Sequence, residues 1–284
     1  MIKILITGRN SYVGNSVNNW LNKEPNIFDI SVLGVKTDSW KEKDFSNFDV
    51  IFHVAGIAHF SKDQSKQELY YKVNRDLTLD IANKAKNEGV AHFIFMSSII
   101  VYGDSSENTR VITKVTKPNP SDFYGDSKLQ AELGLKTLLD NNFNISIIRP
   151  PMIYGKGNKG NYAKLSKLAK VLPIFPDYQN ERSMIHIDNF CEFVKQIIVH
   201  KKYGILFPQN EEYVSTSNLV KEIAANNNRE IYLTKIFNAA IRLLFNIDII
   251  KKLFGNLTYD KELSKYGFNY QIHNFKDSVK ISEE

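Results

Sequence analysis

Tyr124 and Lys128 are the two residues of this sequence whose types and spacing most clearly suggest catalysis. They begin and end the run Tyr-Gly-Asp-Ser-Lys, and residues four apart lie on the same face of a helix. An ammonium beside a phenol lowers a phenol pKa that is otherwise about 10. We therefore expect Tyr124 to exchange a proton with a carbinol or carbonyl oxygen near neutral pH. A pair on a surface helix is the alternative when these two residues are taken alone.

A serine hydroxyl precedes this pair at the end of an apolar run, in residues 95–103. The run predicts a buried strand, so Ser98 would stand at the edge of the sheet, where ligands bind. There it would hydrogen-bond the reacting oxygen and position it for hydride transfer. Ser98, Tyr124 and Lys128 are thus the predicted catalytic residues of an oxidoreductase.

The elements that must position these residues follow from the hydrophobic pattern. Apolar and β-branched runs predict strands, and four-residue spacing of apolar side chains predicts helices. Strands that alternate with helices indicate a parallel, doubly wound α/β sheet. The pattern loosens after about Pro150, which predicts a smaller C-terminal lobe. The predicted strands cover residues 2–6, 30–35, 49–55, 92–96 and 145–148, and the predicted helices cover residues 12–21, 65–88 and 124–139.

The first turn, residues 7–14, links a predicted strand to a predicted helix. Glycines in such a turn let the backbone approach a pyrophosphate, which then sits at the positive end of the helix. Gly8 and Gly14 fit this pattern, and Ser11 occupies the place of the middle glycine of G-x-x-G-x-x-G. A plain strand–helix turn remains the alternative. After the second strand, Lys36 and Arg9 could meet a 2′-phosphate, so NAD and NADP both remain open.

The bulk composition fits a globular, cytoplasmic protein. The chain has 284 residues, 43% of them hydrophobic, and a formal net charge of +6. The basic residues are scattered, which suits a small polyanionic ligand rather than nucleic acid. Cys191 is the only cysteine, so an intrachain disulfide is impossible. No apolar run reaches the roughly 18–20 residues needed to span a bilayer.

Residues 236–254 are rich in Leu, Ile and Phe and also contain Arg242, Lys251 and Lys252. A basic amphipathic helix of this kind can lie on a membrane. Asn246 and Asp248 interrupt the apolar pattern, so we expect this stretch to pack against the rest of its lobe instead.

With these motifs in place, the chain resembles an extended short-chain dehydrogenase/reductase of the NAD-dependent epimerase/dehydratase family over essentially its whole length. The resemblance implies a Rossmann-type sheet in residues 1–150, to which parts of the later chain return, and a nucleotide-sugar-binding lobe mainly in residues 151–284. It also implies a homodimer formed through the predicted helices 65–88 and 124–139. It rests on residues 7–14, 53–56, 73–74 and 149–155, and on Ser98, Tyr124 and Lys128.

The resemblance also implies which residues bind the ligands. Asn161 and Arg182 match residues that contact the diphosphate of a nucleotide sugar, and an Arg suits bidentate pairing with phosphate. The substrate-binding residues implied are Ser98, Ile99, Ile100, Tyr124, Asn161 and Arg182. The implied contacts to NAD or NADP are Gly8, Arg9, Asn10, Ser11, Tyr12, Val13, Gly14, Lys36, Asp44, Phe45, Val54, Ala55, Gly56, Asn74, Ser97, Tyr124, Lys128 and Pro151.

One departure from the family narrows the expected reaction. The 4,6-dehydratases resemble Thr-Asp-Glu-Val-Tyr-Gly at this strand end, whereas this chain has Ile99 and Ile100 in place of the two acids. Isoleucines cannot shuttle protons, so a 4,6-dehydratase is excluded. The resemblance then implies a 4-epimerase or a 4-ketoreductase acting on UDP-hexoses or UDP-N-acetylhexosamines for bacterial capsule or O-antigen synthesis.

Two other classes stay open. A regulator that senses NADP without turnover could use the same fold, although such proteins tend to lose the Tyr or the Lys. A reductase of a non-sugar carbonyl is the other, and Asn161 and Arg182 argue against it. No metal site is expected. His53 and His59 have no evident third ligand, and His186 is expected to pack within its strand.

Overall fold

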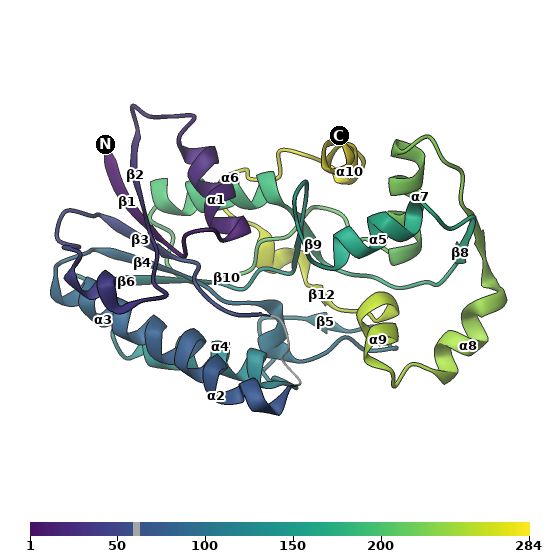
Figure 1. Ribbon diagram of the computed structural model, residues 1–284, viewed down its shortest axis with the longest axis horizontal. Helices are drawn as coiled ribbons and strands as arrows, with labels where there is room; N and C mark the ends of the chain where they lie inside the picture. Colours follow the sequence, from purple (N-terminus) through teal and green to yellow (C-terminus); the bar gives the residue numbers. More distant parts are fainter. Residues whose placement is uncertain (59–62) are drawn as a thin grey trace. The chain divides into compact units, whose positions relative to one another are not determined.

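Six apolar runs of the sequence pair into one parallel sheet (Figure 1). The computed structural model describes residues 1–58 and 63–284. The strand order is β10-β6-β4-β3-β1-β2, so the chain reverses direction along the sheet between β1 and β3. Doubly wound sheets bind ligands at the carboxyl ends of the strands beside such a reversal. The strands are β1 (Ile2–Thr7), β2 (Phe28–Leu33), β3 (Val50–His53), β4 (His92–Met96), β6 (Asn144–Ile148) and β10 (Gly204–Leu206).

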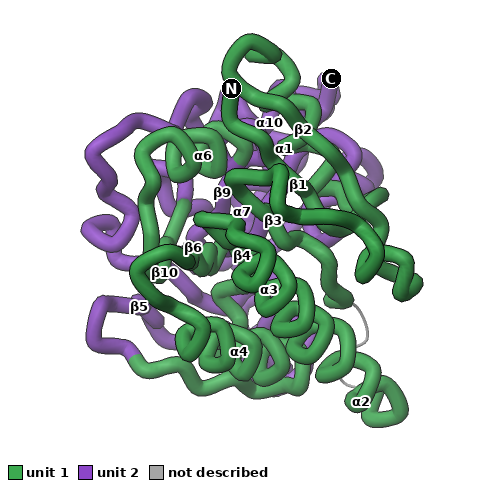
Figure 2. The backbone as a smooth tube through the Cα atoms, turned by 90° about the vertical axis from the view of Figure 1, so that its left-hand side faces the viewer, with its two compact units in different colours: residues 1–103, 117–150, 191–208 green, residues 104–116, 151–190, 209–284 purple. Residues whose placement is uncertain are grey.

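Helices cover both faces of this sheet. In both ribbon views α1 (Tyr12–Leu21) and α6 (Ile187–Val199) lie over one face, and α3 (Leu77–Asn87) and α4 (Phe123–Lys136) lie over the other (Figures 1 and 2). Ala82 of α3 and Ala131 of α4 are fully buried in the core that these helices form with β1, β3, β4 and β6. The predicted Rossmann-type doubly wound sheet is therefore confirmed.

The helix predicted over residues 65–88 contains a change of pitch. It runs as η2 (Gln64–Lys66), α2 (Gln67–Tyr70), the π-helical turn η3 (Tyr71–Asp76) and then α3. One extra residue per turn shifts the side chains that follow, and such turns are frequent at functional sites. Asn74 lies within this π-turn and is fully buried.

The chain divides into two units, which Figure 2 colours separately. Unit 1 comprises Met1–Gly103, Lys117–Pro150 and Cys191–Pro208, and unit 2 comprises Asp104–Thr116, Pro151–Phe190 and Gln209–Glu284. The predicted first domain, residues 1–150, includes residues 104–116, whereas the structure has these residues in unit 2, where β5 (Val111–Ile112) pairs with β12 (Thr258–Tyr259).

Unit 2 has two further two-stranded parallel sheets, β7 (Met152–Tyr154) with β9 (Met184–His186), and β8 (Ile174–Pro176) with β11 (Tyr232–Thr234). Its core contains Tyr154, Tyr162, Leu219, Ile223 and Val279. Its helices are α5 (Asn161–Ala169), α7 (Thr216–Asn226), α8 (Asn238–Leu243), α9 (Asp248–Phe254) and α10 (Phe275–Glu283). The short helical turns of the two units are η1 (Asp38–Glu42), η4 (Ile99–Tyr102), η5 (Lys235–Phe237) and η6 (Lys261–Ser264).

Two expectations about these elements need correction. The second strand ends at Leu33 rather than at Val35, because its register with β1 ends at the pair Thr7–Leu33. The segment 236–254 packs against the core only in part. Ile241, Phe245 and Phe254 are buried in unit 2, whereas several large apolar neighbours of these residues are exposed.

Candidate active site and diphosphate pocket

Ser98 and Tyr124 meet in unit 1 where β4 gives way to the turn η4. Ser98 is the N-cap of η4, and its hydroxyl accepts a hydrogen bond from the backbone N–H of Ile100. Tyr124 is the second residue of α4, which begins after the capping side chain of Asp122. The hydroxyls of Ser98 and Tyr124 are hydrogen-bonded to each other. The fold thus brings together the two hydroxyls that the sequence predicts to contact the reacting oxygen.

Gly125 permits this arrangement. A Cβ at this position would lie 2.8 Å from the carbonyl oxygen of Ile100, closer than real Cβ contacts allow. The first turn of α4 can therefore approach the backbone of η4, which carries Ile99 and Ile100. The side chain of Ile99 is buried and that of Ile100 is partly exposed. Of the two proposed substrate contacts, only Ile100 therefore offers side-chain surface.

The titration of Tyr124 differs from the sequence-based expectation. Burial raises the pKa of Tyr124 to about 12, and the hydrogen bond from Ser98 only partly offsets this. Burial also lowers the pKa of Lys128 to about 8, while Glu132 acts in the opposite direction. The ammonium of Lys128 donates to the backbone oxygen of Met96 at 2.9 Å. Desolvation of the phenol therefore outweighs any effect of the lysine in the protein alone.

A buried ion pair lies one turn beyond Lys128, and sequence reasoning missed it. The side chain of Arg149 donates to both carboxylate oxygens of Glu132, and its Nη1 donates to the hydroxyl of Tyr102 at 2.6 Å. The hydroxyl of Ser97 donates to the same carboxylate. The predicted cofactor residue Ser97 thus has its side chain committed to this network. Glu132 could have been noticed four residues after Lys128, on the same helix face.

The turn after β1 approaches the end of β3 closely. Gly8 has φ of +112°, and a Cβ there would lie 2.9 Å from the backbone nitrogen of Ala55. A Cβ on Gly14 would lie 3.0 Å from Cγ1 of Val54, which is tighter than most real Cβ contacts. Ser11 is the N-cap of α1 and accepts from the N–H of Gly14. The glycines are thus needed for packing, and the serine caps the helix at the middle position of the motif.

This turn fits a pyrophosphate. An α-helix leaves its first N–H groups without intrahelical partners, and these attract anions. Ser11 caps α1 by accepting from the N–H of Gly14, so the positive end of this helix lies at the turn. Asn10 precedes them with φ of +72°.

Asn74 connects the end of β3 to α4. Its amide exchanges two hydrogen bonds with the backbone of Ile57, at 2.9 and 3.0 Å, and donates to the hydroxyl of Ser127. A Cβ on Gly56 would lie 3.0 Å from the side-chain oxygen of Asn74 and 3.1 Å from Nζ of Lys128. Gly56, Asn74 and Lys128 are therefore neighbours. The side chain of Asn74 thus fixes the backbone after β3 to α4 through Ile57 and Ser127.

The remaining predicted cofactor residues are spread over both units. Arg9 and Lys36 are exposed, and Arg9 donates to the carbonyl of Val32 near the end of β2. Asp44 is exposed, and hydrogen bonds from the side chain and the backbone N–H of Ser46 lower the pKa of its carboxyl. Phe45 is fully buried in the unit 1 core, and Pro151 is the first residue of its segment of unit 2.

Unit 2 has a pocket of its own, and both predicted diphosphate ligands line it. Asn161 is the first residue of α5, a helix whose N-cap Gly160 offers no side-chain acceptor. Nη1 of Arg182 donates to the carbonyls of Lys252 and Gly255, at 3.0 and 3.1 Å. Met152, Leu165, Met184, Val214, Thr216, Leu219, Lys252 and Leu253 complete the lining.

The charge of Arg182 is not balanced by an acid. Among residues 1–58 and 63–284 the structure gives it carbonyl partners and no carboxylate, and burial lowers its pKa to about 10. A partly desolvated guanidinium beside a helix N-terminus, an amide and Lys252 is suited to an anion. Lys252 is the residue of this pocket that sequence reasoning missed.

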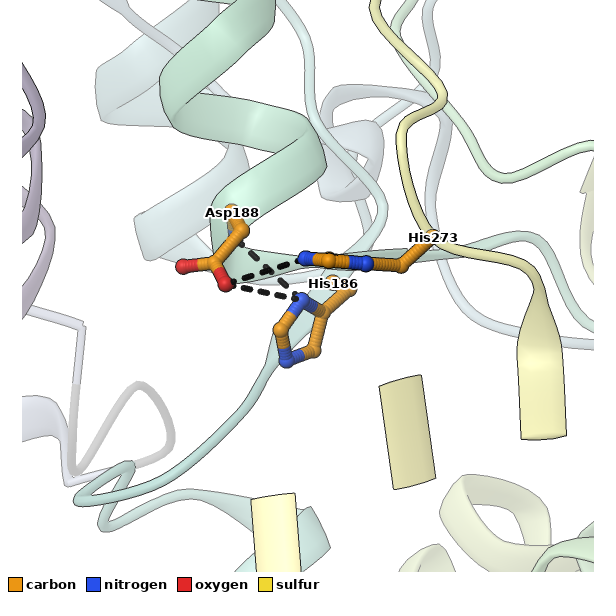
Figure 3. Close-up of side chains that lie close together, drawn as sticks. All are labelled: His186, Asp188 and His273. Atoms are coloured by element: carbon orange, nitrogen blue, oxygen red, sulfur yellow. Dashed lines mark hydrogen bonds and ion pairs between the residues drawn. The ribbon is translucent and has the colours of Figure 1, made fainter. Parts of the chain in front are cut away.

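A group of two histidines and an aspartate also lies in unit 2 (Figure 3). Oδ2 of Asp188 is 3.3 Å from Nε2 of His273 and 3.9 Å from Nδ1 of His186. These are ligand types that Zn²⁺ accepts. However, Nδ1 of His186 already accepts from the N–H of Asp188. We interpret the group as an ion pair of Asp188 with His273. The absence of a metal site stays a prediction, and His59 lies outside the described residues.

Comparison with known proteins agrees with this geometry. The model of the NAD dependent epimerase/dehydratase family matches residues 4–206. A UDP-glucose 4-epimerase of Vibrio cholerae is 30% identical over 276 residues, which cover 92% of this chain and 83% of the relative. An N-acetyl-α-D-glucosaminyl-diphospho-ditrans,octacis-undecaprenol 4-epimerase of Escherichia coli O157:H7 is 28% identical, over 80% of this chain and 73% of the relative.

The fold has a close counterpart among solved structures. A dTDP-4-dehydrorhamnose reductase of Clostridium acetobutylicum superposes with a TM-score of 0.77 at 19% identity, covering 99% of this chain and 98% of that one. The family match, residues 4–206, includes the 7–14 turn together with Ser98, Tyr124 and Lys128. The chain therefore belongs to the NAD-dependent epimerase/dehydratase family.

Proposed function

We propose that this chain is an NAD(P)-dependent enzyme that carries out hydride chemistry at C4 of a nucleotide-linked sugar, as a 4-epimerase or a 4-ketoreductase. The observation that carries the proposal is the hydrogen-bonded pair Ser98–Tyr124 with Lys128 one turn further along α4. The UDP-sugar activity named for the Vibrio cholerae relative supports the choice of substrate class.

The roles of the residues follow from their contacts. Tyr124 exchanges the proton of the C4 oxygen, and Ser98 holds that oxygen by a hydrogen bond. Lys128 keeps a positive charge near the site, fixed by the carbonyl of Met96. Bound NAD(P) supplies or accepts the hydride. A pKa of about 12 keeps Tyr124 protonated at neutral pH, ready to donate its proton to a ketone.

The 7–14 turn would hold the cofactor pyrophosphate, since Gly8 lets the backbone lie close to Ala55 and the turn leads into the N-terminus of α1. Asn161 and Arg182 would bind the diphosphate of the substrate, aided by Lys252. The hydrophobic side chains Ile99 and Ile100 in place of an acid pair exclude proton shuttling for a 4,6-elimination.

A second substrate class deserves a direct test. The Escherichia coli relative is named for a sugar on a lipid-linked diphosphate, which shares the sugar and the diphosphate with a nucleotide sugar. Apart from Asn161, Arg182, Thr216 and Lys252, the pocket of unit 2 is lined by apolar side chains. Such a lining suits a lipid as well as a nucleotide.

The deciding experiment incubates the purified protein with UDP-glucose, UDP-GlcNAc or UDP-4-keto-6-deoxy-GlcNAc, with and without NADH or NADPH. Sugar identity and absorbance at about 340 nm are followed together. Sugar interconversion without a net change in absorbance indicates a 4-epimerase. Cofactor oxidation with the keto sugar alone indicates a 4-ketoreductase. Turnover of a polyprenyl-diphosphate-linked GlcNAc, but of no UDP-sugar, would select the lipid-linked class, and a lack of turnover of all of them would contradict the proposal.

A further inference from the structure

The segment from η5 to α9 exposes several large apolar side chains that do not pack into the core of unit 2. Ile241 and Phe245, four residues apart, point into the core of unit 2 and anchor the segment. Other large apolar side chains of this segment face solvent. Ile236 is 82% exposed, Leu243 83% and Ile249 60%. Phe237, Leu244 and Ile247 are exposed as well.

The charges interleaved with these side chains are mostly positive. Residues 235–252 contain Lys235, Arg242, Lys251 and Lys252 against the single acid Asp248, which gives a net charge of +4 − 1 = +3. We call the exposed apolar residues 236, 237, 243, 244, 247 and 249, together with these four basic residues, the α8–α9 surface.

Charge decides between the possible occupants of this surface. A second copy of the chain, packed through the same surface on a twofold axis, would bring two sets of +3 charges together. A bilayer with anionic headgroups offers both an apolar layer and opposite charge, as amphipathic segments with Lys and Arg require. Each basic residue near an anionic surface adds electrostatic attraction, and salt screens this attraction.

We propose that the α8–α9 surface docks unit 2 onto an anionic lipid bilayer. Docking here means lying in the interface. Within the described part of the chain, no helix has the length and hydrophobicity to cross a bilayer. Short helices such as α8 and α9 insert their exposed side chains only to the boundary of headgroups and acyl chains. The proposal concerns where the enzyme works and does not depend on which sugar it converts.

Helix α9 contributes residues both to the α8–α9 surface and to the pocket of unit 2. Lys252 and Leu253 of α9 line that pocket, and Arg182 donates to the carbonyl of Lys252. A diphosphate bound by Arg182 would therefore lie against the end of α9, and the start of the same helix, with Ile249 in its first turn and Ile247 as its N-cap, belongs to the α8–α9 surface. Docking would bring this anion pocket to the membrane.

The test is flotation of the untagged full-length protein on vesicles of phosphatidylcholine alone or mixed with phosphatidylglycerol. We expect binding to the mixed vesicles that is strong at low salt, weaker at high salt, and weak on phosphatidylcholine alone. The triple variant Ile236→Ser, Leu243→Ser, Ile249→Ser should reduce binding at least tenfold, since each substitution removes apolar surface that would be buried in the bilayer. Lys235→Gln with Lys251→Gln should remove most of the salt dependence.

A matched control carries Ile27→Ser, Val115→Ser and Val199→Ser, three apolar residues that are also exposed but lie outside the α8–α9 surface. It should bind as the parent does. Circular dichroism and turnover of the soluble UDP-sugar check folding and separate this proposal from the proposed function. Should the triple variant misfold, Leu243→Ser alone replaces it, with a smaller loss expected.

Two results would overturn the proposal. The first is a parent protein that stays unbound with anionic vesicles. The second is a parent that self-associates without vesicles and becomes monomeric in the triple variant, which would assign the surface to a second copy of the chain.

Discussion

The two units differ in whether a buried arginine has a carboxylate partner. In unit 1, Arg149 is bound by both oxygens of Glu132 and by Tyr102, and Lys128 is fixed by the carbonyl of Met96. In unit 2, Arg182 lines a pocket with carbonyl partners only. Charges that must be in place before reaction are paired within the protein. We propose that Arg182, which has no carboxylate partner among the described residues, is left available for an anionic ligand.

This comparison predicts that substitutions in unit 1 reduce turnover or stability, whereas substitutions at the pocket of unit 2 weaken binding. The largest effect is expected for Tyr124→Phe. Loss of the proton donor should lower kcat by about 10²–10⁴-fold with little change in KM, measured by steady-state kinetics on the converted sugar.

Tyr71→Phe is the matched control for this change. The hydroxyl of Tyr71 donates to Asp126 at 2.6 Å on the same helix α4, so its loss should affect stability slightly and leave kcat within a few-fold. Equal kcat for Tyr124→Phe and the parent would remove Tyr124 from the chemistry.

The next effect is on stability. Glu132→Gln leaves the guanidinium of Arg149 buried without its counter-charge, which should lower the free energy of unfolding by about 3–5 kcal/mol. Urea denaturation measures this. Glu262→Gln removes an acid from the exposed pair with Lys265 and should cost at most about 1 kcal/mol. Similar losses for the two variants would show that the pair in unit 1 is no more important than a surface pair.

Protonation of the buried His92 in unit 1 should destabilise the folded protein. Burial lowers the pKa of His92 to about 4 from an unfolded value near 6.5. Between these values the unfolded chain binds more protons, so the stability present above pH 6.5 is lost as pH falls toward 4. The loss should reach roughly 3 kcal/mol. Urea denaturation at several pH values should show a shallower decline for His92→Gln, and an unchanged slope would argue against this origin.

The smallest effect is expected in unit 2. Arg182→Gln removes a charge-assisted contact to a diphosphate, so KM should rise roughly 10–100-fold while kcat stays close to the parent value. Arg229→Gln, at an exposed arginine outside the pocket, is the control. A fall in kcat with unchanged KM would place Arg182 in the chemistry and break the contrast between the units.

Much of unit 1 could be predicted from local pattern. The strand over residues 92–96 and the helix over residues 12–21 have the predicted bounds, because apolar side chains recur there with the period of one regular element. The sequence also predicts that Ser98 and Tyr124 contact the same reacting oxygen, because Ser98 follows a strand at the edge where ligands bind, and the structure brings the two hydroxyls together. Asn161 and Arg182 were selected through the family resemblance, and the structure places both in one pocket.

Other features depend on contacts between distant residues. The Glu132–Arg149 pair joins α4 to the end of β6, and residues 104–116 join unit 2 only because β5 meets β12. The pKa of Tyr124 reverses the expectation because the neighbouring lysine was visible in the sequence and the burial was not.

The sequence by itself determined the order of strands and helices, the types of the reacting groups and their order along the chain, because these depend on residue periodicity and side-chain chemistry. Only the tertiary structure decided which charges are paired, that Glu132 near Lys128 binds Arg149, and that Ile236, Leu243 and Ile249 face solvent. Desolvation and packing arise from surfaces that meet across the fold, and one-dimensional spacing does not contain them.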